Sequence, residues 1–350
     1  MSEQHIKPKI GITIGDINGI GPEVVIKALN DNRILSHCIP VIYGSTKTLS
    51  YYRKQINPEE FNYSQVKEDG NFHSKKVNVV NCWDDAIEIK PGVPTPESGK
   101  ASFLSIKGAT NDLKKGTIDA VVTAPIDKKN IQNDEFKFAG HTEYFTQQFD
   151  SKNSLMLLTS DRLRVGVVTG HIPVSQISNK LTKELIASKI SLMVESLKID
   201  FGIAKPKVAV LGLNPHAGDD GLIGDEEAKV ILPAITDIKN KGNLIYGPYP
   251  ADGFFGNGVY KKYDGILAMY HDQGLIPFKT LAFETGVNFT AGLSIVRTSP
   301  DHGTAFNIAG KDIADETSMR YAIYEAIDIV KNRKELEHYS ENALKNSKNE

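Results

Sequence analysis

Three histidines follow short apolar runs and could together hold a metal ion. His171 follows VGVVTG, His216 follows VAVLGLNP and His271 follows GILAMY. Each run is rich in Val, Leu or Ile and is closed by Gly, Pro or Asp, as is typical of a buried parallel strand. Ligands of open α/β sheets bind at the carboxyl ends of strands, so we expect the three imidazoles at one edge. Three neutral imidazoles suit Zn²⁺, Co²⁺ or Ni²⁺ and leave a coordination position for water or substrate.

Two carboxylates are candidates for the general base of such a site. Asp272 follows His271 directly, and Asp252 lies in the segment GPYPADGFF. Asp272, like Asn214 beside His216, could instead orient a metal-bound imidazole through a hydrogen bond. At each histidine the alternative is a hydrogen-bonded structural imidazole, because sequence spacing alone does not bring the three together.

A glycine-rich turn, GDINGIGPEV, follows the first apolar run. Gly15, Gly19 and Gly21 make the turn flexible, and Pro22 begins a helix whose free N–H groups can bind phosphate. Asp16 is expected to face a cleft. The spacing differs from GxGxxG, so this is not the Rossmann fingerprint. The four residues Gly15, Asp16, Gly19 and Gly21 are therefore candidates for cofactor binding, with a plain turn as the alternative.

Five further residues are candidates to bind an anionic substrate. His141 and Thr142, in FAGHTEYF, stand at the expected start of a helix and offer two hydrogen-bond donors, although Thr142 could simply cap the helix. Arg297 lies late in an apolar strand, where a cation is costly to bury without an anion. An internal Asp or Glu is the alternative partner of Arg297. Lys279, in LIPFKTLAF, follows His271 by a few residues and could reach the same site, and Asn288 lies in GVNFTAG.

Composition excludes several classes of partner. The 350 residues carry 41 Lys and Arg against 43 Asp and Glu, a formal net charge of -2. Such a chain has no overall field that attracts nucleic acid or an acidic membrane. No apolar stretch approaches the roughly 18 residues of a membrane span, and no signal peptide is evident. Only two cysteines are present, which fits a reducing cytoplasm. We expect a cytoplasmic protein with a small-molecule ligand.

Strand and helix patterns alternate along the chain, which predicts an α/β fold with a mostly parallel sheet. Apolar runs predict strands at 9–15, 38–44, 76–81, 118–125, 154–160, 163–170, 207–213, 265–270 and 291–299. Amphipathic patterns predict helices at 22–31, 98–116, 181–199, 225–242 and 315–339. The short link at 160–162 predicts a hairpin within the parallel order. The length suits two lobes with a cleft.

Taken together, the motifs resemble the 4-hydroxythreonine-4-phosphate dehydrogenase family of pyridoxal 5'-phosphate biosynthesis. The resemblance rests on GDINGIGPEV, VVTAPIDK, GHTEYF, TGHIP, LNPHAGDDGLIG, GPYPADGFF, MYHDQGLIPFK, GVNFTAGL and RTSPDHGTAF, from residue 15 to about 310. It implies two α/β lobes, as in isocitrate and isopropylmalate dehydrogenases, with helices on both sides of mostly parallel sheets. The implied lobes are 1–130 plus 280–350, and 131–279 with the metal ligands and dimer contacts. The active site would lie in the cleft between the lobes, at the interface of a homodimer.

The resemblance also implies site residues and a reaction. The family's divalent-metal ligands fall on His171, His216 and His271, and the metal would be Zn, Co or Mg. Its substrate-binding positions fall on His141, Thr142, Lys279, Asn288 and Arg297. The implied reaction is NAD- or NADP-dependent oxidation of 4-phosphohydroxy-L-threonine to a 2-amino-3-oxo acid, which decarboxylates to 3-amino-2-oxopropyl phosphate.

Three alternatives stay open at this point. A related branch of the family acts on 4-phospho-D-threonate or D-erythronate, and departures from the family pattern at Ile17, Ala124 and Asp127 leave the choice of substrate open. A metal-dependent phosphohydrolase would also use imidazoles, but it usually needs carboxylates that bridge two metals. A metal-stabilised binding protein would need a fourth protein ligand, and none is evident.

Overall fold

The computed structural model of the chain describes residues 7–66, 70–84, 87–151 and 153–341. Within these residues twelve strands form one sheet, in the order β3-β4-β2-β1-β5-β12-β11-β6-β7-β10-β8-β9. The strands are β1 (Lys9–Thr13), β2 (Ile39–Gly44), β3 (Tyr63–Gln65), β4 (Val77–Asn81), β5 (Ala120–Thr123), β6 (Leu155–Ser160), β7 (Leu163–Thr169), β8 (Lys207–Leu211), β9 (Leu244–Tyr249), β10 (Gly265–Tyr270), β11 (Val287–Ala291) and β12 (Val296–Pro300). Neighbouring strands are parallel except at the pairs β12–β11, β11–β6 and β6–β7. The mostly parallel α/β fold is thus confirmed, and the predicted hairpin joins β6 to β7.

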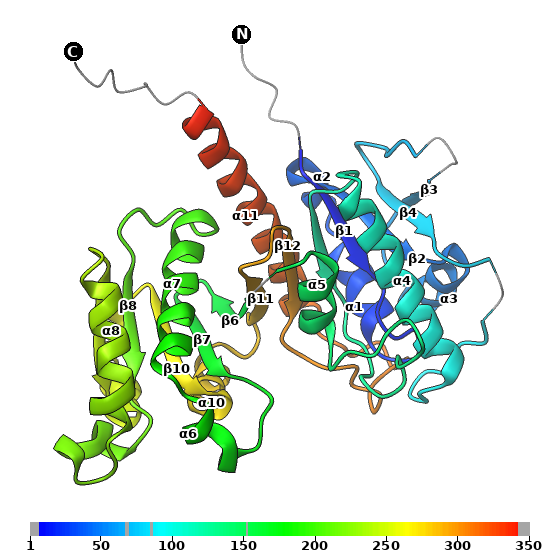
Figure 1. Cartoon of the computed structure of the whole chain (residues 1–350). Helices are drawn as coiled ribbons and strands as arrows, with labels where there is room; N and C mark the ends of the chain where they lie inside the picture. The colour runs from blue at the N-terminus through cyan, green and yellow to red at the C-terminus, as the bar shows by residue number, and fades with distance from the viewer. Residues whose placement is uncertain (1–6, 67–69, 85–86, 152, 342–350) are drawn as a thin grey trace, which may run out of the picture.

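Helices cover this sheet in two bodies (Figure 1). The α-helices are α1 (Gly21–Ala28), α2 (Ile34–His37), α3 (Thr46–Ile56), α4 (Pro96–Lys114), α5 (His141–Gln148), α6 (Ile177–Lys180), α7 (Lys183–Ile199), α8 (Leu232–Lys239), α9 (Ala251–Gly256), α10 (His271–Ala282) and α11 (Thr317–Glu341). The first body contains β1–β5 with α1–α4, and the second contains β7–β10 with α7, α8 and α10. None of the helices in the described segments has the length and apolarity that a membrane span needs.

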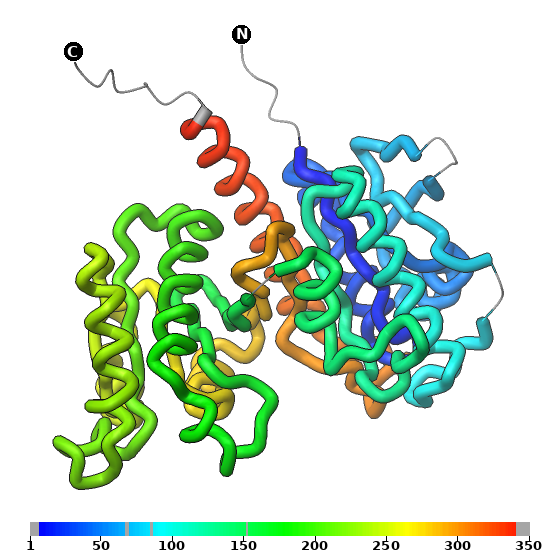
Figure 2. Tube along the Cα trace, in the orientation of Figure 1, coloured from blue at the N-terminus to red at the C-terminus, as the bar shows by residue number. Residues whose placement is uncertain are grey.

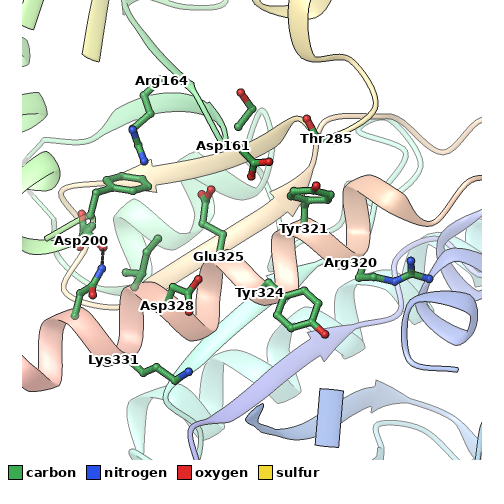
Figure 3. Close-up of a pocket in the computed structure, with 14 residues that line it drawn as sticks. Asp161, Arg164, Asp200, Thr285, Arg320, Tyr321, Tyr324, Glu325, Asp328 and Lys331 are labelled. Carbon is green, nitrogen blue, oxygen red and sulfur yellow. Dashed lines mark hydrogen bonds between the residues drawn. The ribbon is translucent and has the colours of Figure 1, made fainter. Parts of the chain in front are cut away.

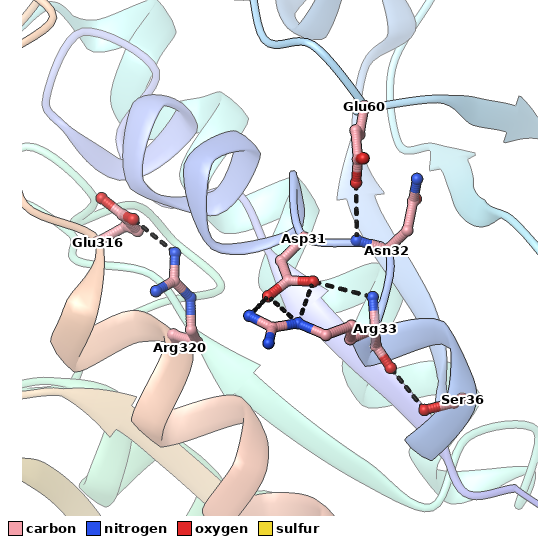
Figure 4. Close-up of polar contacts among 7 residues, drawn as sticks. All are labelled: Asp31, Asn32, Arg33, Ser36, Glu60, Glu316 and Arg320. Atoms are coloured by element: carbon pink, nitrogen blue, oxygen red, sulfur yellow. Dashed lines mark hydrogen bonds and ion pairs between the residues drawn. The ribbon is translucent and has the colours of Figure 1, made fainter.

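The trace in Figure 2 shows that the last part of the chain returns to the middle of the molecule. Helix α11 packs on β12, β11 and β5, and it also contacts α1 and α7. Figure 4 shows its first turn beside the turn after α1, where the exposed Arg33 pairs with Asp31 and lowers the pKa of that carboxyl to about 2. Exposed pairs of this kind contribute little to stability. Because α11 touches elements of both bodies, it holds them together mainly through packing.

The start of helix α4 follows directly from its local sequence. Thr95 accepts a hydrogen bond from Ser98 N at 3.2 Å, and Ser98 Oγ accepts one from Thr95 N at 3.2 Å. This reciprocal arrangement is a capping box, and Pro96 supplies a first helical residue that needs no N–H partner. The helix therefore starts two residues before the predicted 98–116, and it packs on β1, β2 and β5.

The segment from 287 to 300 differs from the sequence prediction. A single strand is predicted over 291–299, whereas the structure has two antiparallel strands, β11 and β12, that turn at Gly292. Gly292 has a φ of 86°, a conformation that residues other than glycine rarely adopt. The apolar run on both sides of this glycine hides the turn. Strands β3 and β9 are also absent from the prediction, because β3 has three residues and β9 is half exposed and contains Pro248.

Helix α5 packs with the first body. Tyr144 stacks on Phe136 with ring centroids 5.2 Å apart, and Phe136 lies 6.1 Å from Phe103 of α4. These rings join the core that contains Val41 and Val121 of the first body. The sequence places residue 131 onward in the second lobe, and the lobe limits near residues 130 and 280 stay a prediction.

Candidate active site

A cavity of about 300 Å³ lies between the two bodies and contains seven of the predicted site residues. They come from six places in the chain: the start of α5, the end of β7, the two ends of α10, and strands β11 and β12. The seven are His141, Thr142, His171, His271, Lys279, Asn288 and Arg297. β5, β7 and β10 all deliver their carboxyl ends or following loops to this place, which is where the strand-end argument predicts a ligand site.

Arg297 is the buried cation of this cavity. It lies on β12 with 3 % of its surface exposed. Thr123 Oγ1 accepts from its Nη2 at 2.8 Å and from its Nε at 3.1 Å, and Thr290 Oγ1 accepts from its Nη1 at 3.2 Å. No carboxylate of the described residues pairs with it, and burial lowers its pKa to about 10. A buried guanidinium that hydroxyl groups alone accompany needs an anion, so the site fits an anionic ligand.

Two neutral polar atoms beside Arg297 also lack partners. His141 Nε2 and Asn288 Oδ1 are buried without a hydrogen bond among the described residues. Burial, together with the charges of Arg297 and Lys128, lowers the pKa of His141 well below its ordinary value. The imidazole is therefore neutral at neutral pH. It can donate or accept one hydrogen bond from a ligand, as an unsatisfied buried group requires.

Lys279 brings a second cation to the cavity, from the last turn of α10. Its Nζ lies 3.2 Å from Asp301 Oδ1. Burial raises the pKa of Asp301, and Lys279 opposes this shift. The sequence analysis missed Asp301 and Lys128, which both line the cavity. The signal for Asp301 was its place directly after the last strand, at the same sheet edge as the predicted site.

His171 and His271 approach each other as two ligands of one ion would. Their ring centroids lie 5.6 Å apart, and two imidazoles on one Zn²⁺ at about 2.0–2.1 Å hold their rings about 5–6 Å apart. Asp272 Oδ1 lies 2.7 Å from Nδ1 of His271, which leaves Nε2 of His271 as the free donor atom. Burial lowers the pKa of His171, which keeps it in the neutral form that a metal needs. The residues therefore fit part of a metal site.

His216 does not join these two histidines within one chain. It is exposed and is not among the residues that line the cavity. No group of three His, Cys, Asp or Glu side chains in the described part of the chain could hold a metal. The residues from His216 to Asp220 all have positive φ, between 44° and 86°, so the histidine stands on a left-handed turn at the surface.

A buried carboxylate holds the base of this turn. Glu227 Oε1 accepts from the backbone N–H groups of Leu213 and Asn214, both at 2.7 Å. Glu226 accepts from Asn214 Nδ2 at 2.7 Å and from Ser178 Oγ at 2.8 Å. Ser178 belongs to α6, in the segment that follows His171. The two glutamates therefore join the segments that carry His171 and His216, and sequence spacing alone gave no sign of this link.

The remaining predicted residues lie outside the cavity. Asp252, on α9, is exposed and does not line it. Asp16 is buried and accepts from Asn18 N at 2.9 Å and from Ser98 Oγ at 3.2 Å. A Cβ on Gly19 would lie 2.8 Å from Thr304 O, so the turn packs closely against the loop that follows β12.

The backbone conformation and close packing of the turn also explain why Gly15 and Gly21 are glycines. Gly15 has a φ of 70°, and a Cβ on Gly21 would lie 2.4 Å from Ile14 O. These constraints explain the glycines of the turn through close backbone packing. The cofactor role of Gly15, Asp16, Gly19 and Gly21 stays a prediction.

The fold and cavity define a class of α/β enzyme with a ligand site between two bodies. The chain resembles the crystal structure of 4-hydroxythreonine-4-phosphate dehydrogenase from Klebsiella pneumoniae, with a TM-score of 0.81 and 34% identity over 94% of this chain and 99% of that one. It is 52% identical to the 4-hydroxythreonine-4-phosphate dehydrogenase of Bacteroides thetaiotaomicron, over 93% of this chain and 90% of that protein. It is 37% identical to the D-threonate 4-phosphate dehydrogenase of Cupriavidus necator, over 93% of this chain and 98% of that protein.

Residues 36–326 match the family described as pyridoxal phosphate biosynthetic protein PdxA. The chain belongs to this family. The resemblance inferred from the motifs is confirmed, and the chain is a dehydrogenase of the class that these relatives represent.

Proposed function

We propose that the chain oxidises 4-phosphohydroxy-L-threonine with NAD⁺ or NADP⁺ and a divalent metal. The product is a 2-amino-3-oxo acid, which loses CO₂ to give 3-amino-2-oxopropyl phosphate. The observation that carries this proposal is Arg297, a buried guanidinium that faces the cavity with hydroxyl groups as its only described partners. The relative at 52% identity supports the same substrate.

The cations and neutral donors would bind the two anionic ends of the substrate. Arg297 would bind one anionic group through charge-assisted hydrogen bonds, and His141 Nε2 and Asn288 Nδ2 could donate to the same group. Lys279, at the other end of α10 from His271, would bind the second. His141 adds a hydrogen bond without adding charge, because its imidazole is neutral. This arrangement would hold the substrate's C3 between the two anionic ends.

The metal would be held by His171 and His271, with His216 of a second copy as the third ligand. We infer the second copy because His216 stands on an exposed turn outside the cavity of its own chain. When bound, the metal would lower the pKa of the substrate's C3 hydroxyl group, and the nicotinamide ring would accept the hydride from C3. Asp272 would fix the tautomer of His271, since its carboxylate lies on Nδ1. Asp252 would reach the site only from the second copy.

The choice between NAD⁺ and NADP⁺, and between Zn²⁺, Co²⁺ and Mg²⁺, is part of the same proposal. Imidazole ligands favour Zn²⁺ or Co²⁺ over Mg²⁺, which prefers oxygen. We propose a cytoplasmic homodimer.

A second candidate substrate is D-threonate 4-phosphate, which the relative at 37% identity is named for. It carries a hydroxyl where 4-phosphohydroxy-L-threonine carries an amino group. The phosphate and carboxylate contacts of Arg297 and Lys279 serve both molecules, so the discrimination depends on the group at C2.

The test is to supply the purified, metal-replete protein with NAD⁺ or NADP⁺ and each of the two substrates in parallel. Reduced cofactor and CO₂ are measured together. We expect both products from 4-phosphohydroxy-L-threonine and their loss on chelation, with recovery when Zn²⁺ or Co²⁺ is returned. Turnover of D-threonate 4-phosphate alone would contradict the proposed substrate but would still support an oxidation followed by loss of CO₂. Phosphate release without cofactor reduction would contradict the dehydrogenase proposal itself.

A further inference from the structure

A second cavity, of about 790 Å³, lies near the turn between β6 and β7. Figure 3 shows side chains from β7, from the loop before β11 and from α11 around it. None of the residues predicted from the sequence lines this cavity. Its lining residues with charge are Asp161, Arg164, Asp200, Arg320, Glu325, Asp328 and Lys331.

This second cavity lies behind the catalytic cavity, across the sheet. Leu158 of β6 lines the catalytic cavity. The next residue, Thr159, points to the opposite face, because successive side chains of a strand alternate. Its hydroxyl contacts Glu325 of α11. On the neighbouring strand β7, Arg164 stands directly opposite Thr159 in register, so Thr159, Arg164 and Glu325 meet on one face.

Arg164 is a cation that the charges of Glu325, Asp264 and Asp161 influence without any of them forming an ion pair with it. No hydrogen bond or ion pair to its guanidinium occurs in the described segments, and its Nε is buried. Its Cζ lies 4.5 Å from the ring centroid of Phe201. Burial lowers its pKa. The ring stabilises the cation, but the buried Nε–H still lacks an acceptor, so a carboxylate or similar anion fits in front of the guanidinium.

Glu325 is a carboxyl group with too few hydrogen-bond donors around it. Its two oxygens lie 2.7 and 2.6 Å from Thr159 Oγ1, and a hydroxyl group has one hydrogen to give. No cation of the described residues pairs with Glu325. Burial raises its pKa to about 7, with Arg164 opposing the shift and Asp328 and Asp200 adding to it. An ammonium group would supply both the missing donors and the missing charge.

The other charges of the cavity are partly satisfied. Arg320 pairs with Glu316 at 2.5 Å, and Asp200 pairs with Arg333 at 2.7 Å. Arg164 and Glu325 instead point toward each other across the cavity without forming an ion pair (Figure 3). A simple anion would satisfy Arg164 but repel Glu325, and a simple cation would do the reverse. The space between them fits a molecule that carries both charges.

We propose that this cavity binds an α-amino acid, with its carboxylate on Arg164 and its ammonium group on Glu325. The rings of Tyr321 and Tyr324 line the same cavity and offer a surface for the side chain. The site is independent of the proposed reaction, since the sheet separates the two cavities. Its strands are nevertheless shared, because Val287, which pairs with Thr159, precedes Asn288 of the catalytic cavity.

The test is to measure binding of each proteinogenic L-amino acid to the full chain by saturation-transfer NMR and thermal shift. We expect at least one to bind, and we expect Arg164→Gln and Glu325→Gln each to weaken it about tenfold or more. Arg164→Lys should give an intermediate loss, because it keeps the charge and loses the planar fork. Arg297→Gln is the matched control and should leave this binding unchanged.

Several results would overturn the proposal. Absence of binding by every amino acid would do so, as would binding that survives Arg164→Gln and disappears in Arg297→Gln. Equal competition by acetate or inorganic phosphate would show that the cavity selects an anion only. Circular dichroism and the melting temperature show whether each variant is folded. If Arg164→Gln is not folded, the loss of binding in Arg164→Lys tests the role of Arg164 instead.

Discussion

The two cavities on opposite faces of strand β6 each contain an arginine without an ion pair, but Arg297 is buried, Arg164 is half-buried, and their surroundings differ. Arg297, in front, is accompanied by the hydroxyls of Thr123 and Thr290. Arg164, behind, lies over the ring of Phe201 and faces the carboxyl group of Glu325, with Asp161 in the same cavity. Neither has a described counter-ion, so each predicts a bound anion. The acidic neighbour of Arg164 adds a demand for a positive charge, so we expect the groups around each arginine to decide the class of ligand.

The largest expected effect comes from removing the front arginine. Arg297→Gln should lower kcat/KM about 100-fold or more, because hydrogen bonds to a charged group contribute about 1.5–3 kcal/mol each. Steady-state kinetics with the proposed substrate measure this. Arg33→Gln is the control, since Arg33 is exposed and pairs only with Asp31. Equal kinetics of the Arg297 variant and the wild type would remove the basis of the comparison.

The carboxyl group behind the sheet should affect stability with pH. Glu325 has a folded pKa of about 7, above its ordinary value of 4.5, so the folded chain binds more protons than the unfolded chain between these values. Its contribution to the free energy of unfolding is complete below about pH 4.5 and is lost as pH rises through 7, up to about 3 kcal/mol. Urea unfolding at several pH values should show this decline.

Glu325→Gln should flatten the decline, because the amide does not titrate. Glu184→Gln, at an exposed position of α7, should keep it. If the wild type and Glu325→Gln show the same pH dependence, the carboxyl is not desolvated as the structure indicates, and the contrast between the two arginines weakens.

Asp272 should matter less than Arg297, because it acts through His271. Asp272→Asn should weaken metal binding about 10–100-fold, as expected when the hydrogen-bond partner of a metal-bound histidine is changed. Titration with Co²⁺, followed by its visible absorption, measures the affinity without turnover. Unchanged affinity would show that the 2.7 Å contact to His271 Nδ1 does not orient a ligand.

The smallest effect should come from the ring beneath Arg164. A double-mutant cycle of Phe201→Leu and Arg164→Gln should give a coupling energy of about 0.5–1 kcal/mol in thermal or urea unfolding. The cycle removes the packing cost of each single change. A coupling energy of zero would mean that solvent, rather than Phe201, stabilises the cation in the absence of a ligand.

Much of the front cavity could be predicted because its residues follow strand ends. His171 and His271 come directly after apolar runs that form β7 and β10, and a sheet brings such ends together. Arg297 was conspicuous as a charge inside an apolar strand, and the structure leaves it without an internal carboxylate partner. Sequence gives these positions because each depends on the local pattern of one element.

The rest depends on contacts between distant segments. His216 stands on a left-handed turn held by Glu227. The spacing of apolar residues in the sequence does not predict that turn. The turn at Gly292 is hidden within an apolar run that looks like one strand. The rear cavity joins Thr159, Arg164 and Glu325 from β6, β7 and the last helix, and each of these residues alone looks like an ordinary surface polar group.

The most direct test concerns the central claim that a second copy completes the metal site. His171→Ala and His216→Ala chains, each inactive alone, are mixed, dissociated and allowed to reassociate. If His216 acts on the partner's site, half of the dimers are mixed and each has one complete site, so activity and metal binding should recover to about one quarter of the wild type. No recovery, with mixed dimers shown to form by native mass spectrometry, would contradict the account and place all three histidines in one chain.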